Sequence, residues 1–277
     1  MATVQENVER FGRDYAWDQG GDEWSEAWGG ADMQWYGTFL PRLHCFLPAD
    51  TILEIAPGFG RWTDYLKDLC RELTVVDLNA NCIDYCKSRF SSSTNITYHV
   101  NDGKSLDMIP GESIARIVSF DSLVHVEADV IDAYLSQFPR ILTASGIALI
   151  HHSNFAACLR GLPRVLLSIP KLRGALLRLG LLRDYTNRDH WRAKSVSADV
   201  FTEICKKHGL QCIGQEIINW TARKVFTDCI SVVTKTGSPW CRKPTVLENK
   251  DFRAEIGRMR RLSALYGRAS FGTTCSQ

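Results

Sequence analysis

Apolar and polar positions along this chain follow two periods in turn, one typical of strands and one typical of helices. Short apolar runs of the kind found in buried strands occur at 52–55, 73–77, 98–100, 114–121, 147–150, 212–220 and 225–235. Apolar residues with helical spacing occupy 33–46, 62–70, 79 onward, 122–137 and 195–208. This order predicts an α/β fold that is doubly wound around a mostly parallel, seven-stranded sheet.

The stretch 52–63 stands out, because an apolar strand breaks there into a glycine turn before a helix begins. Gly58 and Gly60 permit a positive φ or a close backbone approach, and Trp62 opens the helix. Such a loop, at the carboxyl end of a strand, presents backbone amides and a helix N-terminus to a ligand. Glycines at this spacing also serve ordinary turns, so the loop alone is a weak signal.

Two acidic residues at later strand ends narrow the ligand class. Asp77 ends the run at 73–77, where a carboxylate accepts hydrogen bonds from the two hydroxyls of a ribose. Asp102 follows the run at 98–100, where it is placed to accept from an adenine amine. The pattern therefore predicts a ligand that contains adenosine. Thr63 stands where a dinucleotide site has its third glycine, so a pyrophosphate is not specified.

The glycine loop and the acidic strand ends together resemble the class I S-adenosylmethionine-dependent methyltransferases. The resemblance covers 35–235 and implies a Rossmann-like methyltransferase fold with an antiparallel pair of final strands. It implies S-adenosylmethionine as the cofactor, with Ala56 in place of the family's usual first glycine. The cofactor-binding residues that it implies are Glu54, Ala56, Gly58, Gly60, Asp77, Leu78, Asp102, Gly103 and Asp121.

Three short sequences, LEIAPGFGRWT, FDSLVHVE and HHSN, are similar to a bacterial group that acts on sugars of surface polysaccharides or glycosylated metabolites. This similarity implies methyl transfer to a sugar hydroxyl of a glycan or glycosylated acceptor, a form of polysaccharide modification. Two alternatives stay open. One is methylation of a small non-sugar molecule at oxygen or nitrogen, and the other is a non-catalytic cofactor-binding scaffold.

A hydroxyl acceptor needs a general base, and three histidines are candidates. His151 and His152 follow the run at 147–150 in a polar stretch that is expected to point into the active site, and they rank ahead of His125. Adjacent residues on an extended chain point to opposite sides, so we expect only one of the two to act, with a structural histidine as the alternative. Asp121 ends the preceding strand and is expected near both the cofactor and the reaction.

Composition excludes some classes of partner. Lys and Arg number 33 and Asp and Glu 31, a net charge of +2 that offers no global field for nucleic acid. The ten cysteines are scattered without a Cys-x-x-Cys pair, which favours reduced thiols in a cytoplasmic protein. Charged residues from Glu6 to Arg13 do not fit a secretory signal peptide. Magnesium on Asp121, Glu127 and the histidines is an alternative that no ligand spacing requires.

We divide the chain into an N-terminal lid at 1–34, the cofactor-binding domain at 35–235 and a C-terminal helical tail at 236–277. In the lid, Trp24 and Trp28 are expected on one helix face, where they either pack on the domain or stack on a sugar. Asn154, after the fifth strand, is the third residue expected at the acceptor.

A helical cap is expected as an insertion at 155–190, because apolar and basic residues alternate there around two prolines. The cap either packs on the domain or, through 155–182, contacts anionic lipid at the inner face of the membrane. The second alternative would suit a lipid-linked acceptor. The oligomeric state is left open.

Overall fold

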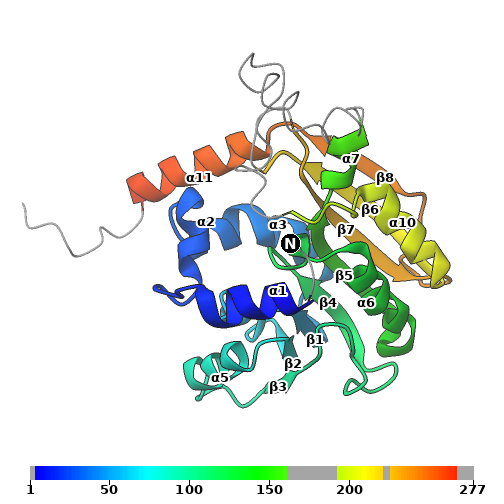
Figure 1. Cartoon of the computed structure of the whole chain (residues 1–277), viewed down its shortest axis with the longest axis horizontal. Helices are drawn as coiled ribbons and strands as arrows, with labels where there is room; N and C mark the ends of the chain where they lie inside the picture. The colour runs from blue at the N-terminus through cyan, green and yellow to red at the C-terminus, as the bar shows by residue number, and fades with distance from the viewer. Residues whose placement is uncertain (1–3, 161–191, 221–224, 267–277) are drawn as a thin grey trace, which may run out of the picture.

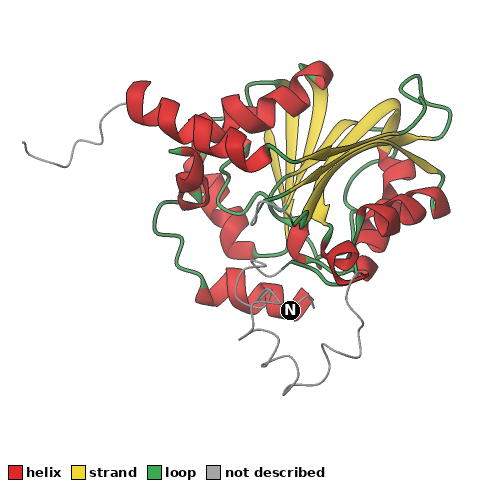
Figure 2. Ribbon diagram, turned by 90° about the horizontal axis from the view of Figure 1, so that it is seen from above, coloured by secondary structure: helices red, strands yellow, loops and turns green. Residues whose placement is uncertain are grey.

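The computed structural model describes residues 4–160, 192–220 and 225–266, which form an eight-stranded sheet with helices on both faces (Figures 1 and 2). The strands are β1 (Ala49–Ile55), β2 (Cys70–Asp77), β3 (Ile96–Val100), β4 (Ile114–Ser119), β5 (Leu142–Ser153), β6 (Leu210–Ile218), β7 (Asp228–Lys235) and β8 (Thr245–Asn249). The α-helices are α1 (Val4–Glu9), α2 (Ala31–Gln34), α3 (Leu40–Leu43), α4 (Thr63–Leu66), α5 (Ala80–Arg89), α6 (Ala128–Ile141), α7 (Phe155–Arg160), α10 (Ala198–Lys207) and α11 (Phe252–Tyr266). Shorter 3-10 or π-helical turns span Arg10–Asp14, Asp22–Trp28, Trp35–Phe39, His44–Phe46 and Leu123–His125.

The strand order is β3-β2-β1-β4-β5-β7-β6-β8. Neighbouring strands from β3 to β5 are parallel, β7 is antiparallel to both of its neighbours, and β8 is parallel to β6. The prediction of a doubly wound, mostly parallel sheet is confirmed. The antiparallel pair implied by the family resemblance is present as β6 and β7.

The sheet has one strand more than the seven predicted. β8 pairs with β6 beyond residue 235, so the C-terminal segment contributes a strand as well as the expected helix α11. Four of its five side chains are exposed, and a strand with so little buried surface has no apolar run by which to recognise it. Arg42 on α3 secures this edge through ion pairs with Glu216 of β6 at 2.6 Å and Glu255 of α11 at 3.1 Å.

Both faces of the sheet are covered, which explains why its strands read as continuous apolar runs. Leu53 and Ile55 of β1 belong to the apolar cluster formed with α6 and α10, whereas Ile52 belongs to the cluster formed with α3 and α11. Alternate side chains of one strand therefore anchor helices on opposite faces. This packing holds the carboxyl ends of β1, β2 and β4 rigidly at one edge.

Two predicted helices differ in form from the expectation. The helix predicted at 33–46 is present as a continuous helical stretch of mixed type, in which a π-helical turn precedes α3 and its Pro41, which cannot donate a backbone hydrogen bond. The helix expected at 62–70 is the four-residue α4, since β2 already begins at Cys70. Asn79 occupies the N-cap position of α5, but its side chain makes no capping hydrogen bond there.

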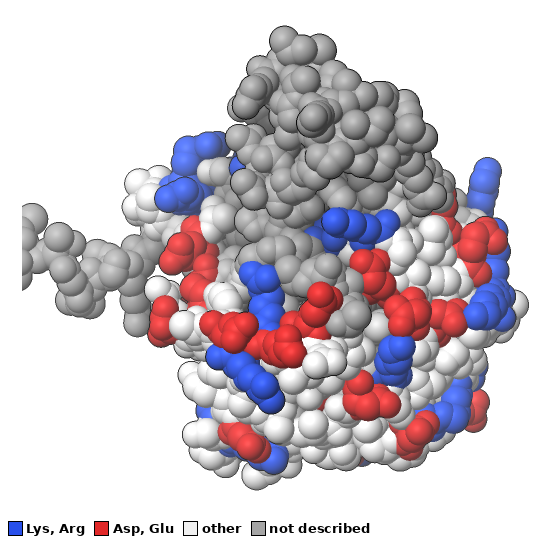
Figure 3. Space-filling model, viewed as in Figure 1, with Lys and Arg blue, Asp and Glu red and all other residues white. Residues whose placement is uncertain are grey.

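The insertion predicted at 155–190 lies outside the described residues except for α7, so the cap and its lipid contact stay predictions, as does the division into domains. Among the described ranges, no helix has both the length and the apolarity needed to cross a bilayer. The nine cysteines in those ranges are free thiols. Figure 3 shows acidic and basic side chains interleaved, with acidic ones in a band across the middle of the face. The exclusion of nucleic acid stays a prediction.

Candidate functional site

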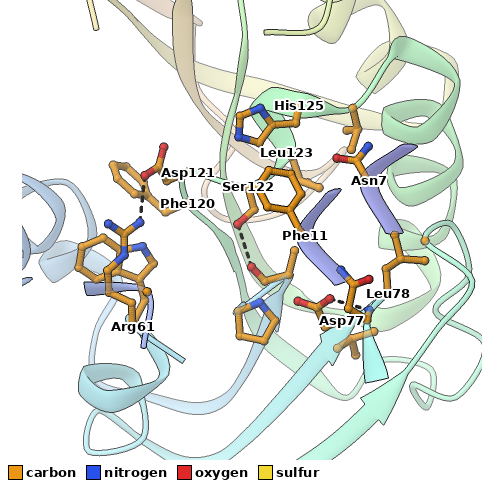
Figure 4. Close-up of a pocket in the computed structure, with 18 of the residues that line it drawn as sticks. Asn7, Phe11, Arg61, Asp77, Leu78, Phe120, Asp121, Ser122, Leu123 and His125 are labelled. Carbon is orange, nitrogen blue, oxygen red and sulfur yellow. Dashed lines mark hydrogen bonds and ion pairs between the residues drawn. The ribbon is translucent and has the colours of Figure 1, made fainter. Parts of the chain in front are cut away.

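A cavity lies at the carboxyl ends of β1, β2 and β4 (Figure 4), and Figure 1 shows α1 of the N-terminal segment in front of these strand ends. Its floor comes from the sheet edge and its cover from the first helical turns of the chain. Figure 4 shows Asp77 and Leu78 at one end, Arg61 and Asp121 at the other, and Phe11, Ser122 and His125 between them. The residues that line it on the covering side include Val4, Asn7, Phe11, Trp17 and Trp24.

The glycine turn after β1 is tight and left-handed. Ala56 and Gly58 both have φ of 58°, and Gly60 has φ of 84°. A Cβ at Gly60 would lie 2.5 Å from the ring of Phe90, so glycine is required there for space as well as for conformation. Ala56 adopts the same conformation at a cost of about 1 kcal/mol. Ser122 holds it by donating to the Ala56 carbonyl at 2.8 Å.

Asp77 is buried at the end of β2 and lines the cavity. It accepts hydrogen bonds from the backbone N–H groups of Asn79 at 2.8 Å and Gly58 at 3.1 Å. Burial raises its pKa to about 6, and the backbone hydrogen bonds limit that rise. Above that pH it is a carboxylate with remaining lone pairs for two ligand hydroxyls. Leu78 and Gly103 line the wall beside it.

Glu54 and Asp102, two more of the residues implied to bind cofactor, are not among those that line the cavity. Glu54 lies beneath the glycine turn, 3% exposed, and accepts from Thr63 Oγ1 at 2.6 Å. Burial raises its pKa to about 7. Asp102 is exposed and accepts from the backbone N–H groups of Lys104 and Ser105. Glu54 therefore holds the start of α4 from beneath the turn and Asp102 stabilises its own loop, and neither residue lines the cavity.

Arg61 is the residue that the sequence analysis missed. Its guanidinium lines the cavity, forms an ion pair with Asp121 at 2.9 Å and stacks on the Trp62 ring. It also donates to Ser25 at 3.0 Å and Gln34 at 3.3 Å. The available signal was its position, because a cation directly after a glycine turn opens the helix that faces the ligand.

Trp62 Nε1, a buried donor next to Arg61 in the cavity lining, has no hydrogen-bond partner within the described residues. Unpaired buried donors are uncommon and destabilising, so they favour an acceptor supplied by a ligand. A cation beside one spare donor fits a carboxylate, and the buried Asp77 at the opposite end fits a ribose. The cavity thus fits S-adenosylmethionine, which carries both groups.

The three histidines occupy different environments. His125 is 8% exposed and lines the cavity, where it contacts the Phe11 ring at 5.4 Å. His151 and His152 are both fully buried, and the expectation that they point into the active site is wrong. His152 stacks on Phe201 and contacts Ser231 Oγ at 2.8 Å, and burial lowers its pKa to about 3. β5 extends three residues past its predicted end, and both strand faces are covered there.

The three residues that were expected to contact the acceptor also occupy different environments. Trp24 lines the cavity and stacks on Tyr15, whereas Trp28 is 1% exposed and donates to Thr38 Oγ1. The expectation of one shared helix face is wrong, because they lie on a 3-10 helix, where residues four apart diverge by about 120°. Asn154 is buried outside the cavity lining and accepts from the Ala198 backbone at 2.9 Å.

The proposed metal ligands are engaged by protein groups. Asp121 pairs with Arg61, and Glu127 accepts from the backbone N–H groups of Lys194 and Ser195. Within the described part of the chain, no cluster of three His, Cys, Asp or Glu side chains is arranged to hold an ion. Magnesium stays an untested alternative.

Asp77→Asn should weaken binding of S-adenosylhomocysteine by about 10-fold or more, because hydroxyl hydrogen bonds to a charged carboxylate contribute ~1.5–3 kcal/mol. Calorimetric titration measures the change. Asp84→Asn, on the exposed face of α5, is the matched control for lost charge. Asp102→Asn should change affinity less than 3-fold by our estimate, since its carboxylate bonds only its own loop. Equal losses at positions 77 and 102 would contradict this geometry.

Glu54→Gln should stabilise the protein at alkaline pH. A buried acid with a pKa of about 7, against 4.5 when unperturbed, binds more protons in the folded state. The wild-type free energy of unfolding therefore falls as pH rises through that interval. The variant's advantage should grow by about 2 kcal/mol between about pH 5 and about pH 8. Urea unfolding without cofactor measures it, with the exposed Glu72→Gln as control; a pH-independent difference would refute the titration.

Comparisons with known proteins agree with this site. Residues 52–146, from β1 into β5, match the family model described as a methyltransferase domain. The ribosomal RNA small subunit methyltransferase A of Coxiella burnetii is 34% identical over 58 residues, 21% of this chain and 22% of that protein. The squalestatin hexaketide synthase of Phoma sp. is 29% identical over 117 residues, 38% of this chain and 4% of that protein. The chain thus spans a small part of these curated relatives.

The fold has a counterpart among solved structures. A methyltransferase of Leishmania major, described as S-adenosylmethionine-dependent, superposes with a TM-score of 0.56 at 10% identity over 83% of this chain and 82% of that one. At that identity the likeness shows the fold alone. Together, the doubly wound sheet and the family match at 52–146 show that the chain contains a methyltransferase domain, and the cavity at its sheet edge fits S-adenosylmethionine as the cofactor.

Proposed function

We propose that the protein is an S-adenosylmethionine-dependent O-methyltransferase that acts on a hydroxyl of a sugar in a glycan or glycosylated acceptor. The observation that carries the proposal is that one cavity gathers a buried carboxylate, a cation, an aromatic wall and one histidine. The carboxylate and the cation suit the two ends of the cofactor, and the aromatic wall and the histidine suit the acceptor. S-adenosylmethionine, when bound, supplies an electrophilic methyl group.

The binding roles follow from charge and burial. Asp77 would accept from the ribose hydroxyls, with Leu78 and Gly103 against the adenine. Arg61 and Trp62 Nε1 would donate to the carboxylate of the methionine part. Holding both ends of the cofactor aligns its centre for in-line displacement, which supplies much of the rate.

The acceptor role is assigned to the aromatic residues of the covering segment. Trp17 stacks on Phe59 at 4.4 Å, and Trp24 stacks on Tyr15 at 5.1 Å, so both rings are held rigidly where they line the cavity. A rigid aromatic face binds the apolar C–H face of a sugar with little loss of entropy. His125 lines the same cavity, against the Phe11 ring of the covering segment, and would accept the proton of the attacking hydroxyl.

His125→Ala should lower kcat about 100-fold or more, as loss of a general base does, and change cofactor affinity little. The exposed His44→Ala is the matched control and should retain full turnover. Methyl transfer from labelled cofactor to a panel of sugar nucleotides and glycosides is the assay, with their aglycones and a structured RNA as alternative acceptors. Methylation of an aglycone alone would favour the non-sugar alternative. Cofactor binding without transfer to any acceptor would favour the scaffold.

Trp24→Ala should raise the KM for a sugar acceptor up to about 10-fold and spare the affinity for S-adenosylhomocysteine, since lost ring stacking is worth ~0.5–1.5 kcal/mol. Trp240→Ala, on a ring that contacts Phe46 away from the cavity, is the matched control. An unchanged acceptor KM in Trp24→Ala would remove the sugar-stacking role. A change confined to cofactor affinity would reassign the ring to the methyl donor.

A further inference from the structure

A buried chain of hydrogen bonds connects the cavity to side chains that do not line it. Arg192 donates to both carboxylate oxygens of Asp228, at 2.8 and 2.6 Å. Asp228 Oδ2 lies 3.2 Å from His151 Nε2, and His151 Nδ1 accepts from the backbone N–H of Asp121 at 3.1 Å. Asp121 then forms its ion pair with Arg61 in the cavity. The His151 and Asp228 side chains are fully buried.

The donors and acceptors in this series of hydrogen bonds permit only one tautomer of His151. A backbone N–H can only donate, so Nδ1 must carry the lone pair that receives it. Asp228 stays a carboxylate: burial alone would raise its pKa, but the charge and hydrogen bonds of Arg192 hold it well below its usual range. A carboxylate can only accept, so Nε2 must carry the proton. Asp228 therefore sets the tautomer, and Arg192 keeps Asp228 charged.

Asp121, which donates the backbone hydrogen bond to His151, has a strained backbone conformation. Asp121 has φ of 65°, a left-handed conformation that costs a non-glycine residue about 1 kcal/mol or more. That conformation directs the carboxylate toward Arg61 in the cavity, as Figure 4 shows. The His151 ring packs against the rings of Phe120 at 4.8 Å and Trp220 at 5.0 Å, which also contact each other at 6.3 Å. Its Nδ1 is thus a fixed anchor for the strained turn.

We propose that His151 and Asp228 are positioning residues: Asp228 fixes the Nε2–H tautomer of His151, which anchors Asp121 and so orients Arg61 toward the amino-acid end of the methyl donor. The proposal rests on the proposed use of S-adenosylmethionine. It assigns the two residues no contact with the reacting atoms. It separates them from Asp77, which would serve the adenosine end.

The tautomer is tested directly by the ¹⁵N chemical shifts of His151 in labelled protein. The wild type should show a protonated Nε2 and an unprotonated Nδ1, and a protonated Nδ1 would overturn the proposal without any variant. In Asp228→Asn the new amide can donate to Nε2, so the tautomer should reverse or become mixed. Asp132→Asn, beside the partly exposed His208, is the matched control and should leave the His151 signals unchanged.

The link to the cofactor is tested with two substitutions of His151, each of which retains a polar atom at the position of only one of the two ring nitrogens. The amide of Asn reaches the position of Nδ1, so His151→Asn retains an acceptor for Asp121. The amide of Gln reaches the position of Nε2, so His151→Gln retains the contact with Asp228 and loses the anchor. His151→Gln should therefore weaken S-adenosylhomocysteine binding about 10-fold more than His151→Asn, at matched thermal stability.

A second ligand locates the effect along the cavity. 5′-Methylthioadenosine lacks the amino-acid end of the cofactor, so its affinity should be nearly equal in wild type, His151→Gln and Asp228→Asn. Equal losses for both ligands, or equal losses in the Asn and Gln variants, would show a merely structural role. If the folded wild type binds neither ligand, the proposed cofactor is refuted, and the ¹⁵N spectra still decide whether Asp228 sets the tautomer.

Discussion

The cavity depends on one constraint, the common register of three parallel strands. Ile55 of β1 lies beside Val76 of β2, and Glu54 lies beside Val118 of β4, so the three strands end at one level. The chain must reverse direction immediately beyond that level. Two of its reversals use left-handed non-glycine residues, Ala56 after β1 and Asp121 after β4. The strain of these turns is sustained by the apolar packing on both faces of the sheet.

Burial gives carboxylates at this edge different roles. Asp77 and Glu54 are raised in pKa by desolvation, and only Asp77 has a ligand-facing position. Asp228 is buried as deeply, yet Arg192 holds it as an anion. A carboxyl group can thus accept hydrogen bonds from a ligand, stabilise a turn or serve as a fixed charge, according to the cation or hydrogen-bond donor beside it. Lost solvation would destabilise each of them if its partners were absent.

The N-terminal segment closes the site with aromatic contacts rather than with a strand or a long helix. Trp17, Phe59 and Tyr85 form a continuous stack, with ring centroids 4.4 and 4.0 Å apart. Arg89 on α5 donates to the carbonyls of Gly20 and Phe59, and so joins this segment to the glycine turn. The N-terminal segment and the glycine turn therefore pack as one unit. Sequence periodicity does not reveal such contacts, because they join residues far apart in the chain.

The sequence alone determined the succession of the first seven strands and the helices between them along the chain, the doubly wound class, and the glycine turn with Asp77 at the next strand end. These features are local, since side-chain period and backbone freedom are written in neighbouring residues. Only the tertiary structure decided which polar residues face the cavity. His151, His152 and Trp28 lie in the interior, while His125, Trp24 and Arg61 line the cavity. Period predicts on which side of a strand a residue lies, but what covers that side depends on helices and loops contributed by distant sequence.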